Sequence, residues 1–170
     1  IIKHACIKDA AFFDFLKTKT LADFRNDPAM LAALIEKNVA IKTSVVLNDE
    51  FETGDRKLLN FGHTIGHAIE NIYSLPHGHA ISIGMLASCS ISEKINNFDP
   101  AATQKIIALL QQYQLPVQLA IDKDKIWDIL LMDKKRSNNS MSFVVLDAIG
   151  NAVVKPIPLV QLKDLIDQCL

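Results

Sequence analysis

Four histidines lie close together near the middle of the chain: His63, His67, His77 and His79. They are four of the five histidines in 170 residues, and they fall within the 17 positions from 63 to 79. Two histidines four residues apart on a helix, such as His63 and His67, can converge on one metal ion, although this pair lacks the glutamate of the metalloprotease pattern. A catalytic zinc site uses three protein ligands and one open position. The cluster therefore predicts a metal site.

Four polar residues, two of which belong to this cluster, are separated by four, three and four positions. They are Arg56, Asn60, His63 and His67. On one helix over residues 55–73, at about 100° per residue, they share an arc of about 60°. A solvated helix face is the simpler interpretation, but such faces usually carry better helix formers than Asn and His. Gly62 and Gly66 each cost about 1 kcal/mol in a helix interior, so we expect them to admit a closely packed neighbour.

Charged residues flank this segment on both sides. Lys42 and Glu52 precede it, and the run Asp133-Lys134-Lys135-Arg136 follows. Cationic side chains around a metal suit an anionic substrate such as a carboxylate or phosphate. A basic run at a helix end is also typical of a solvated C-terminus that complements the helix dipole.

The elements that must position these residues are mostly helical. Apolar spacing predicts helices over 4–18, 28–47, 55–73, 79–94, 100–113, 123–132 and 159–170. Asp27-Pro28 and Asp99-Pro100 are typical helix starts, because Asp caps and Pro fits the first helical position. Residues 141–146 and 152–157 read as two strands of one hairpin, which we expect to be peripheral. We predict a mainly α fold in one domain over residues 1–170, with this small hairpin near the C-terminus.

Composition excludes several classes of protein. The chain is 49% hydrophobic and 22% charged, which excludes a disordered or collagen-like chain. A net charge of −1 gives no electrostatic footprint for nucleic acid or an anionic membrane. Cys6, Cys89 and Cys169 are odd in number and widely spaced, which favours free thiols in a reducing compartment. The apolar stretch at 81–91 is too short to span a bilayer. We therefore expect a cytoplasmic protein.

Several segments, in order along nearly the whole chain, resemble the 3-dehydroquinate synthase family. They are IIKHACIKD (1–9), KTSVVLNDEFE (42–52), ETGDRKLLNFGHTIGHAIE (52–70), HGHAISIGM (77–85), DKK (133–135) and FVVLDAIG (143–150). The resemblance covers the family's C-terminal helical domain and not its N-terminal NAD-binding domain. The family belongs to the lyases of the shikimate pathway and of aromatic amino acid biosynthesis. It converts 3-deoxy-D-arabino-heptulosonate 7-phosphate to 3-dehydroquinate and phosphate.

The resemblance implies two cofactors and a phosphorylated, carboxylated sugar-acid substrate. The cofactors are NAD, bound mainly by the N-terminal domain that is absent from this chain, and a divalent metal, usually zinc. The implied reaction is oxidation, phosphate elimination, re-reduction, ring opening and aldol closure. The family also implies a homo-oligomer, with no nucleic-acid or membrane partner.

The resemblance also implies roles for individual residues. His63 and His77 match metal ligands, while Glu52 and His67 match acid/base positions. The substrate-binding matches are Lys3, Lys42, Arg56, Asn60 and one of Lys134 and Lys135, of which we favour Lys135. The chain contains no match to a residue that binds the NAD cofactor.

Two departures from the family qualify this expectation. The third metal ligand of the family, a glutamate, would fall immediately before Ile1, so we expect the chain alone to lack a ligand and to be inactive. His79 stands where the family commonly has glutamate; we favour a neutral change over a substitute ligand. The competing interpretations are a related sugar-phosphate cyclase and a stand-alone, non-catalytic helical metal-binding module.

Overall fold

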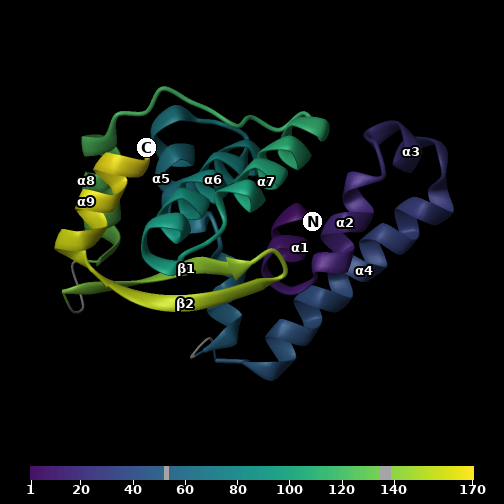
Figure 1. Cartoon of the computed structure of the whole chain (residues 1–170), viewed down its shortest axis with the longest axis horizontal. Helices are drawn as coiled ribbons and strands as arrows, with labels where there is room; N and C mark the ends of the chain where they lie inside the picture. Colours follow the sequence, from purple (N-terminus) through teal and green to yellow (C-terminus); the bar gives the residue numbers. More distant parts are fainter. Residues whose placement is uncertain (52–53, 135–138) are drawn as a thin grey trace.

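The computed structural model describes residues 1–51, 54–134 and 139–170, and it confirms a mainly α fold with one hairpin. The helices within these residues are α1 (Ile2–Lys8), α2 (Ala10–Lys17), α3 (Leu21–Asn26), α4 (Pro28–Asn48), the 3₁₀ helix η1 (Asp55–Asn60), α5 (His63–Tyr73), α6 (His77–Asn96), α7 (Pro100–Gln112), α8 (Lys123–Lys134) and α9 (Leu159–Cys169). Strands β1 (Ser140–Ala148) and β2 (Asn151–Pro158) pair in antiparallel fashion. Figure 1 shows α5, α6 and α7 above the hairpin, with α8 and α9 at one end and α2 to α4 at the other.

The first strand of the hairpin, β1, lies inside the core, so the expectation that the hairpin is peripheral was wrong. Successive side chains of β1 point to opposite faces, and both faces are covered. Phe143 and Val145 join a cluster with α5, α6, α8 and α9, whereas Val144 and Leu146 join a second cluster with α1, α2, α6 and α7. The Ser92 hydroxyl of α6 accepts a hydrogen bond from the Leu146 amide at 3.0 Å. The strand therefore joins the two halves of the core.

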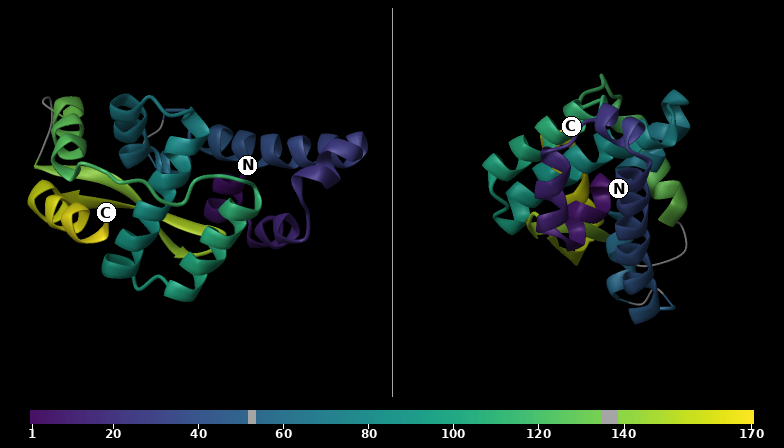
Figure 2. Two further views of the ribbon diagram at one scale, coloured as in Figure 1. Left: turned by 90° about the horizontal axis from the view of Figure 1, so that it is seen from above. Right: turned by 90° about the vertical axis from the view of Figure 1, so that its right-hand side faces the viewer.

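Short polar side chains determine where the first helices begin and end. Asp9 accepts a hydrogen bond from the Phe12 amide at 2.8 Å and forms an ion pair with Lys37 at 2.7 Å. This cap divides the single helix expected over 4–18 into α1 and α2. Thr20 and Asp23 form a capping box that begins α3, a helix that we did not predict. Helix α4 runs along the molecule and, with α3, projects beyond the remainder (Figure 2).

The helix expected over 55–73 is two helices, not one. Gly62 adopts a φ of 77°, a left-handed conformation that favours glycine and ends η1 before α5 begins at His63. Arg56 and Asn60 consequently lie on η1, while His63 and His67 lie on α5. The continuous four-residue line predicted from helical spacing therefore does not exist; only His63 and His67 keep their expected relation.

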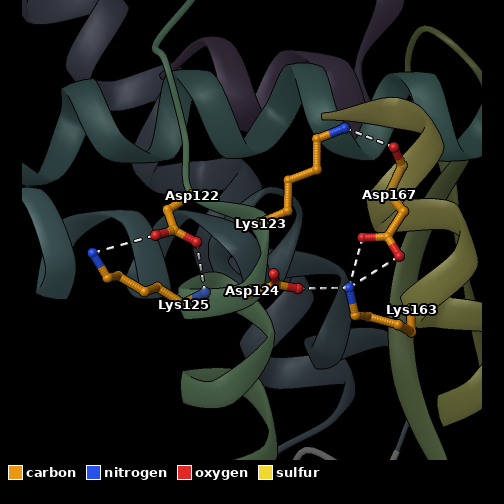
Figure 3. Close-up of polar contacts among 6 residues, drawn as sticks. All are labelled: Asp122, Lys123, Asp124, Lys125, Lys163 and Asp167. Atoms are coloured by element: carbon orange, nitrogen blue, oxygen red, sulfur yellow. Dashed lines mark hydrogen bonds and ion pairs between the residues drawn. The ribbon is translucent and has the colours of Figure 1, made fainter.

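Ion pairs join the last two helices. Lys163 of α9 contacts Asp167 at 2.7 Å and Asp124 of α8 at 3.2 Å (Figure 3). Lys123 of α8 donates to the Asp167 carbonyl oxygen at 2.6 Å, and the Asp122 carboxylate accepts from the Lys125 amide at 3.2 Å. The N-terminal end of α8 is thereby fastened to α9, and the opposite end of α8 carries Lys134.

The cysteines and the helices match two further expectations. Cys6, Cys89 and Cys169 are free, and the first two are buried. Among the described residues, every helix is too short or too polar to cross a membrane.

Candidate functional site

Three imidazole rings meet where α5 packs against the start of α6. The ring centroids of His63 and His67 lie 5.1 Å apart, and that of His77 lies 5.5 Å from His63 and 5.9 Å from His67. Helical spacing brings the first two together. His77 joins them because α5 ends at Tyr73 with a left-handed cap at Ser74, which has a φ of 49°, and α6 begins at His77 itself. Three of the four clustered histidines therefore lie together in the structure, and the metal site itself stays a prediction.

Two of the three rings are held by an oxygen acceptor at Nδ1. Nδ1 of His63 lies 3.2 Å from the Phe61 carbonyl oxygen, and Nδ1 of His77 lies 3.0 Å from Oε2 of Glu70. A carbonyl or ionised carboxylate oxygen can only accept, so Nδ1 carries a proton in both rings, and in a neutral ring Nε2 then keeps its lone pair. The ring nitrogens of His67 make no hydrogen bond to the described residues.

The donor atoms present at this cluster suit a divalent transition metal. One ligand atom from each of His67, Glu70 and His77 lies within 4.8 Å of the other two. Imidazole nitrogen and carboxylate oxygen are the ligands that zinc takes in catalytic sites. These three residues, a group that does not include His63, therefore fit such an ion.

The side chain of Lys3 reaches this cluster from α1. Its Nζ donates to the Leu59 carbonyl oxygen at 2.6 Å and lies 3.4 Å from Nε2 of His63. Burial, and then the charge of Lys42, lowers the pKa of Lys3 to about 8. Burial, and then the charge of Lys3, lowers the pKa of His63 to about 4. His63 is consequently neutral at pH 7, the state in which an imidazole nitrogen binds a metal.

A cavity of about 770 Å³ opens on one side of the cluster. Its cationic lining residues are Lys3, Arg25 and Lys42, which join His63 and His77. Much of the remaining wall is apolar, including side chains from α3, α4 and α6. This cavity can hold an anionic group beside positive charge. The sequence analysis named Lys3 and Lys42 as substrate-binding residues but did not single out Arg25.

A second cavity of about 610 Å³ lies on the other side of His63. Asn60, His67 and Lys57 line it together with residues of α8 and the hairpin. Because His63 borders both cavities, the imidazole cluster forms the wall between them. Lys57 is a further cation that the sequence analysis did not single out.

Several predicted residues lie apart from the cluster or outside the described residues. The Arg56 side chain donates to the Glu50 carbonyl oxygen at 2.5 Å and lines neither cavity. Glu52 and Lys135 lie outside the described residues, as does the side chain of Lys134. His79 is half-buried, and the ring contacts of the cluster do not include it.

Glu70 is a functional candidate that the sequence analysis missed. It follows His67 by three residues, which places both on one face of α5. That spacing was available as a signal, but only the position of His77 shows which group the carboxylate meets.

The sequence as a whole matches a known family. The family model described as 3-dehydroquinate synthase C-terminal matches residues 1–136. The chain belongs to this family. The 3-dehydroquinate synthase of Clostridium beijerinckii is 40% identical over 160 residues, which cover 91% of this chain and 45% of that protein. The synthase of Sulfolobus acidocaldarius is 34% identical, with 100% of this chain and 50% of that protein covered. The chain thus spans about half the length of these relatives of the 3-dehydroquinate synthase family.

Solved structures share the fold at lower sequence identity. A 2-epi-5-epi-valiolone synthase from Streptomyces hygroscopicus subsp. jinggangensis, with NAD⁺ and Zn²⁺ bound, has a TM-score of 0.82 at 21% identity. A 2-deoxy-scyllo-inosose synthase complexed with carbaglucose-6-phosphate, NAD⁺ and Co²⁺ has a TM-score of 0.78 at 24% identity. Each match covers 99% of this chain and slightly under half of the other. This chain therefore shares its fold with about half of each of these two synthases.

Proposed function

We propose that this chain is the metal- and substrate-binding part of a 3-dehydroquinate synthase, a carbon–oxygen lyase. The observation that carries this proposal is the convergence of His63, His67 and His77 beside Lys3, in a chain of the matching family. The substrate would be 3-deoxy-D-arabino-heptulosonate 7-phosphate, and the products 3-dehydroquinate and phosphate. The relatives are about twice as long, and the NAD-binding domain would lie in the part of the protein that this chain does not include.

His63 and His77 would hold the divalent metal, with zinc as the favoured ion. Metal-ligating histidines usually donate the other ring N–H to a carbonyl or carboxylate oxygen, and both rings have such a partner. A bound metal supplies polarisation of the substrate hydroxyl group that is oxidised. The two solved structures hold NAD⁺ with Zn²⁺ or Co²⁺, which supports the same cofactor pair here.

His67 would act in proton transfer. Its ring touches those of His63 and His77, is exposed, and lines the second cavity. Because its ring nitrogens are not engaged with the described residues, either can accept or donate a substrate proton. Glu52, at the second acid/base position, is proposed from the family resemblance alone.

Cationic and amide groups would bind the two anionic ends of the substrate. Lys3 and Lys42 share the larger cavity with two of the histidines, and Asn60 borders the other cavity. Such charged donors bind carboxylate and phosphate oxygens more strongly than neutral donors do. Arg56 and one of Lys134 and Lys135 complete the proposed set on the family resemblance.

The test is phosphate release by the full-length, zinc-loaded polypeptide given the heptulosonate phosphate and NAD⁺. Lys42→Met should raise the KM for the substrate, while Lys105→Met, an exposed lysine on α7, should leave it unchanged. A correctly folded, metal-loaded protein that releases no phosphate would refute the proposal.

A related sugar-phosphate cyclase is the second candidate, because the TM-scores of 0.78 and 0.82 belong to such enzymes. The curated relatives at 34–40% identity favour the dehydroquinate reaction. Turnover measured on heptulosonate phosphate, sedoheptulose 7-phosphate and glucose 6-phosphate separates the two candidates. A stand-alone binding module would bind metal and turn over none of the three.

A further inference from the structure

We infer that Glu70 is a positioning residue for His77: its carboxylate holds the imidazole in the tautomer and orientation that a bound divalent cation requires. This inference rests on the proposed metal-binding role of His77. The contact itself joins Oε2 of Glu70 to Nδ1 of His77 at 3.0 Å and spans the turn between α5 and α6.

The chemistry of the contact selects one tautomer. An ionised carboxylate offers no proton, so the proton of the hydrogen bond resides on Nδ1 of His77. In the neutral ring, Nε2 then presents its lone pair to a cation. A carboxylate acceptor also raises the basicity of the opposite ring nitrogen, which strengthens it as a ligand.

Little else restrains the His77 ring. It is the first residue of α6, and 57% of its side chain is exposed. Within the described part of the chain, Glu70 is the only hydrogen-bond partner of the ring, and the rings of His63 and His67 lie beside it. Glu70 lies in the last turn of α5, the helix that also carries His67. Helix α5, which supplies His67, thus also orients His77 through Glu70.

Glu70 could instead be a ligand itself, because one of its oxygens lies within 4.8 Å of donor atoms on His67 and His77. The two roles respond differently to substitution. Glu70→Gln keeps an oxygen acceptor for Nδ1–H but removes the negative charge, whereas Glu70→Ala removes both. A positioning role therefore predicts that Gln retains much of the function, and a ligand role predicts that Gln fails as Ala does.

The first measurement is Co²⁺ titration of the full-length polypeptide followed by visible absorption. We expect Glu70→Ala to weaken Co²⁺ binding by about 10–100-fold, the range for loss of a ligand's hydrogen-bond partner. Glu70→Gln should lose clearly less affinity, and all forms should share one spectrum at saturation. Glu36→Gln and Glu36→Ala, at an exposed site on α4, serve as matched controls and should bind like the unmodified protein.

The second measurement needs neither metal nor substrate, so it separates failure of this inference from failure of the proposed function. Nitrogen NMR of labelled histidine should show protonated Nδ1 at His77 in the unmodified protein and in Glu70→Gln, and a tautomer mixture in Glu70→Ala. Unchanged Co²⁺ affinity in Glu70→Ala, an equal loss in the Gln and Ala variants, or an unchanged tautomer would each overturn the inference.

Discussion

A Cβ atom on Gly84 would lie 2.1 Å from the carbonyl oxygen of Gly62. It would also lie 2.7 Å from the Gly66 amide nitrogen, so α6 packs directly on the backbone that begins α5. The close approach expected for Gly62 and Gly66 is confirmed, and its counterpart is a third glycine on α6. This contact determines the separation of the two helices that carry His63 and His77.

Gly84→Ala should destabilise the protein and disturb the imidazole cluster. The clash is with backbone atoms, which cannot rotate away, so we expect a loss of about 1–3 kcal/mol or more in the free energy of unfolding. Urea denaturation measures this loss. Gly78→Ala is the matched control, because a Cβ on Gly78 meets nothing within 4 Å. Equal stabilities of the two variants would contradict the packing argument.

His77→Ala and His79→Ala should differ sharply in metal binding. The ring of His77 belongs to the cluster, and the ring contacts of the cluster do not include His79. Zn²⁺ titration should show a loss for His77→Ala greater than the about 10–100-fold typical of outer-shell changes. His79→Ala should bind Zn²⁺ as the unmodified protein does; a comparable loss there would make His79 a substitute ligand.

Ser92→Ala should weaken the attachment of the hairpin to α6. The Ser92 hydroxyl accepts from the buried Leu146 amide at 3.0 Å and donates to the Ser88 carbonyl oxygen at 2.6 Å. Removal leaves a buried N–H without a partner, at a cost of about 1–3 kcal/mol. Thermal denaturation should show this loss for Ser92→Ala, while Ser90→Ala, at a half-buried site on the same helix, should change stability little. A stable Ser92→Ala protein would count against a structural role for this bond.

His4 should make stability depend on pH between about 6.5 and 4. Burial lowers the pKa of His4 from 6.5 to about 4, while its hydrogen bond to Asn38 at 2.7 Å opposes that shift and the charges of Lys3 and Lys42 add to it. In this interval the unfolded chain binds a proton at His4 and the folded chain does not. The free energy of unfolding should therefore fall as pH drops from 6.5 to 4.

The measurement is urea unfolding of the metal-free protein across this pH range. His4→Gln should show a shallower fall, because it removes one proton-binding group, while the contribution of His63 remains in both proteins. Parallel pH profiles for the two proteins would show that His4 does not contribute.

The local signals in the sequence were reliable where the structure is itself local. Asp27-Pro28 and Asp99-Pro100 begin α4 and α7 as predicted, because a side-chain cap and a fixed φ act within one helical turn. The pairing of His63 with His67 is likewise a property of one helix. The family resemblance predicted roles for residues that are distant in sequence from the histidines, such as Lys3.

Local signals failed where backbone conformation or tertiary contact overrode periodicity. Gly62 adopts a left-handed conformation, so a regular helical spacing from Arg56 to His67 crosses a break that residue counting cannot detect. Strand β1 is buried because other elements cover both of its faces, a fact that alternation along one strand does not reveal.

The sequence by itself determined a mainly α chain, its family, and the presence of side chains of the types that ligate metals, because residue type and helical period are local properties. Only the tertiary structure decided which of these side chains meet. It brings Lys3 from α1 to His63, leaves Arg56 beside Glu50, and sets Glu70 against His77. These relations depend on the close contact of α5 with α6 and on the packing of α1 against η1, and such contacts between distant segments leave no period in the sequence.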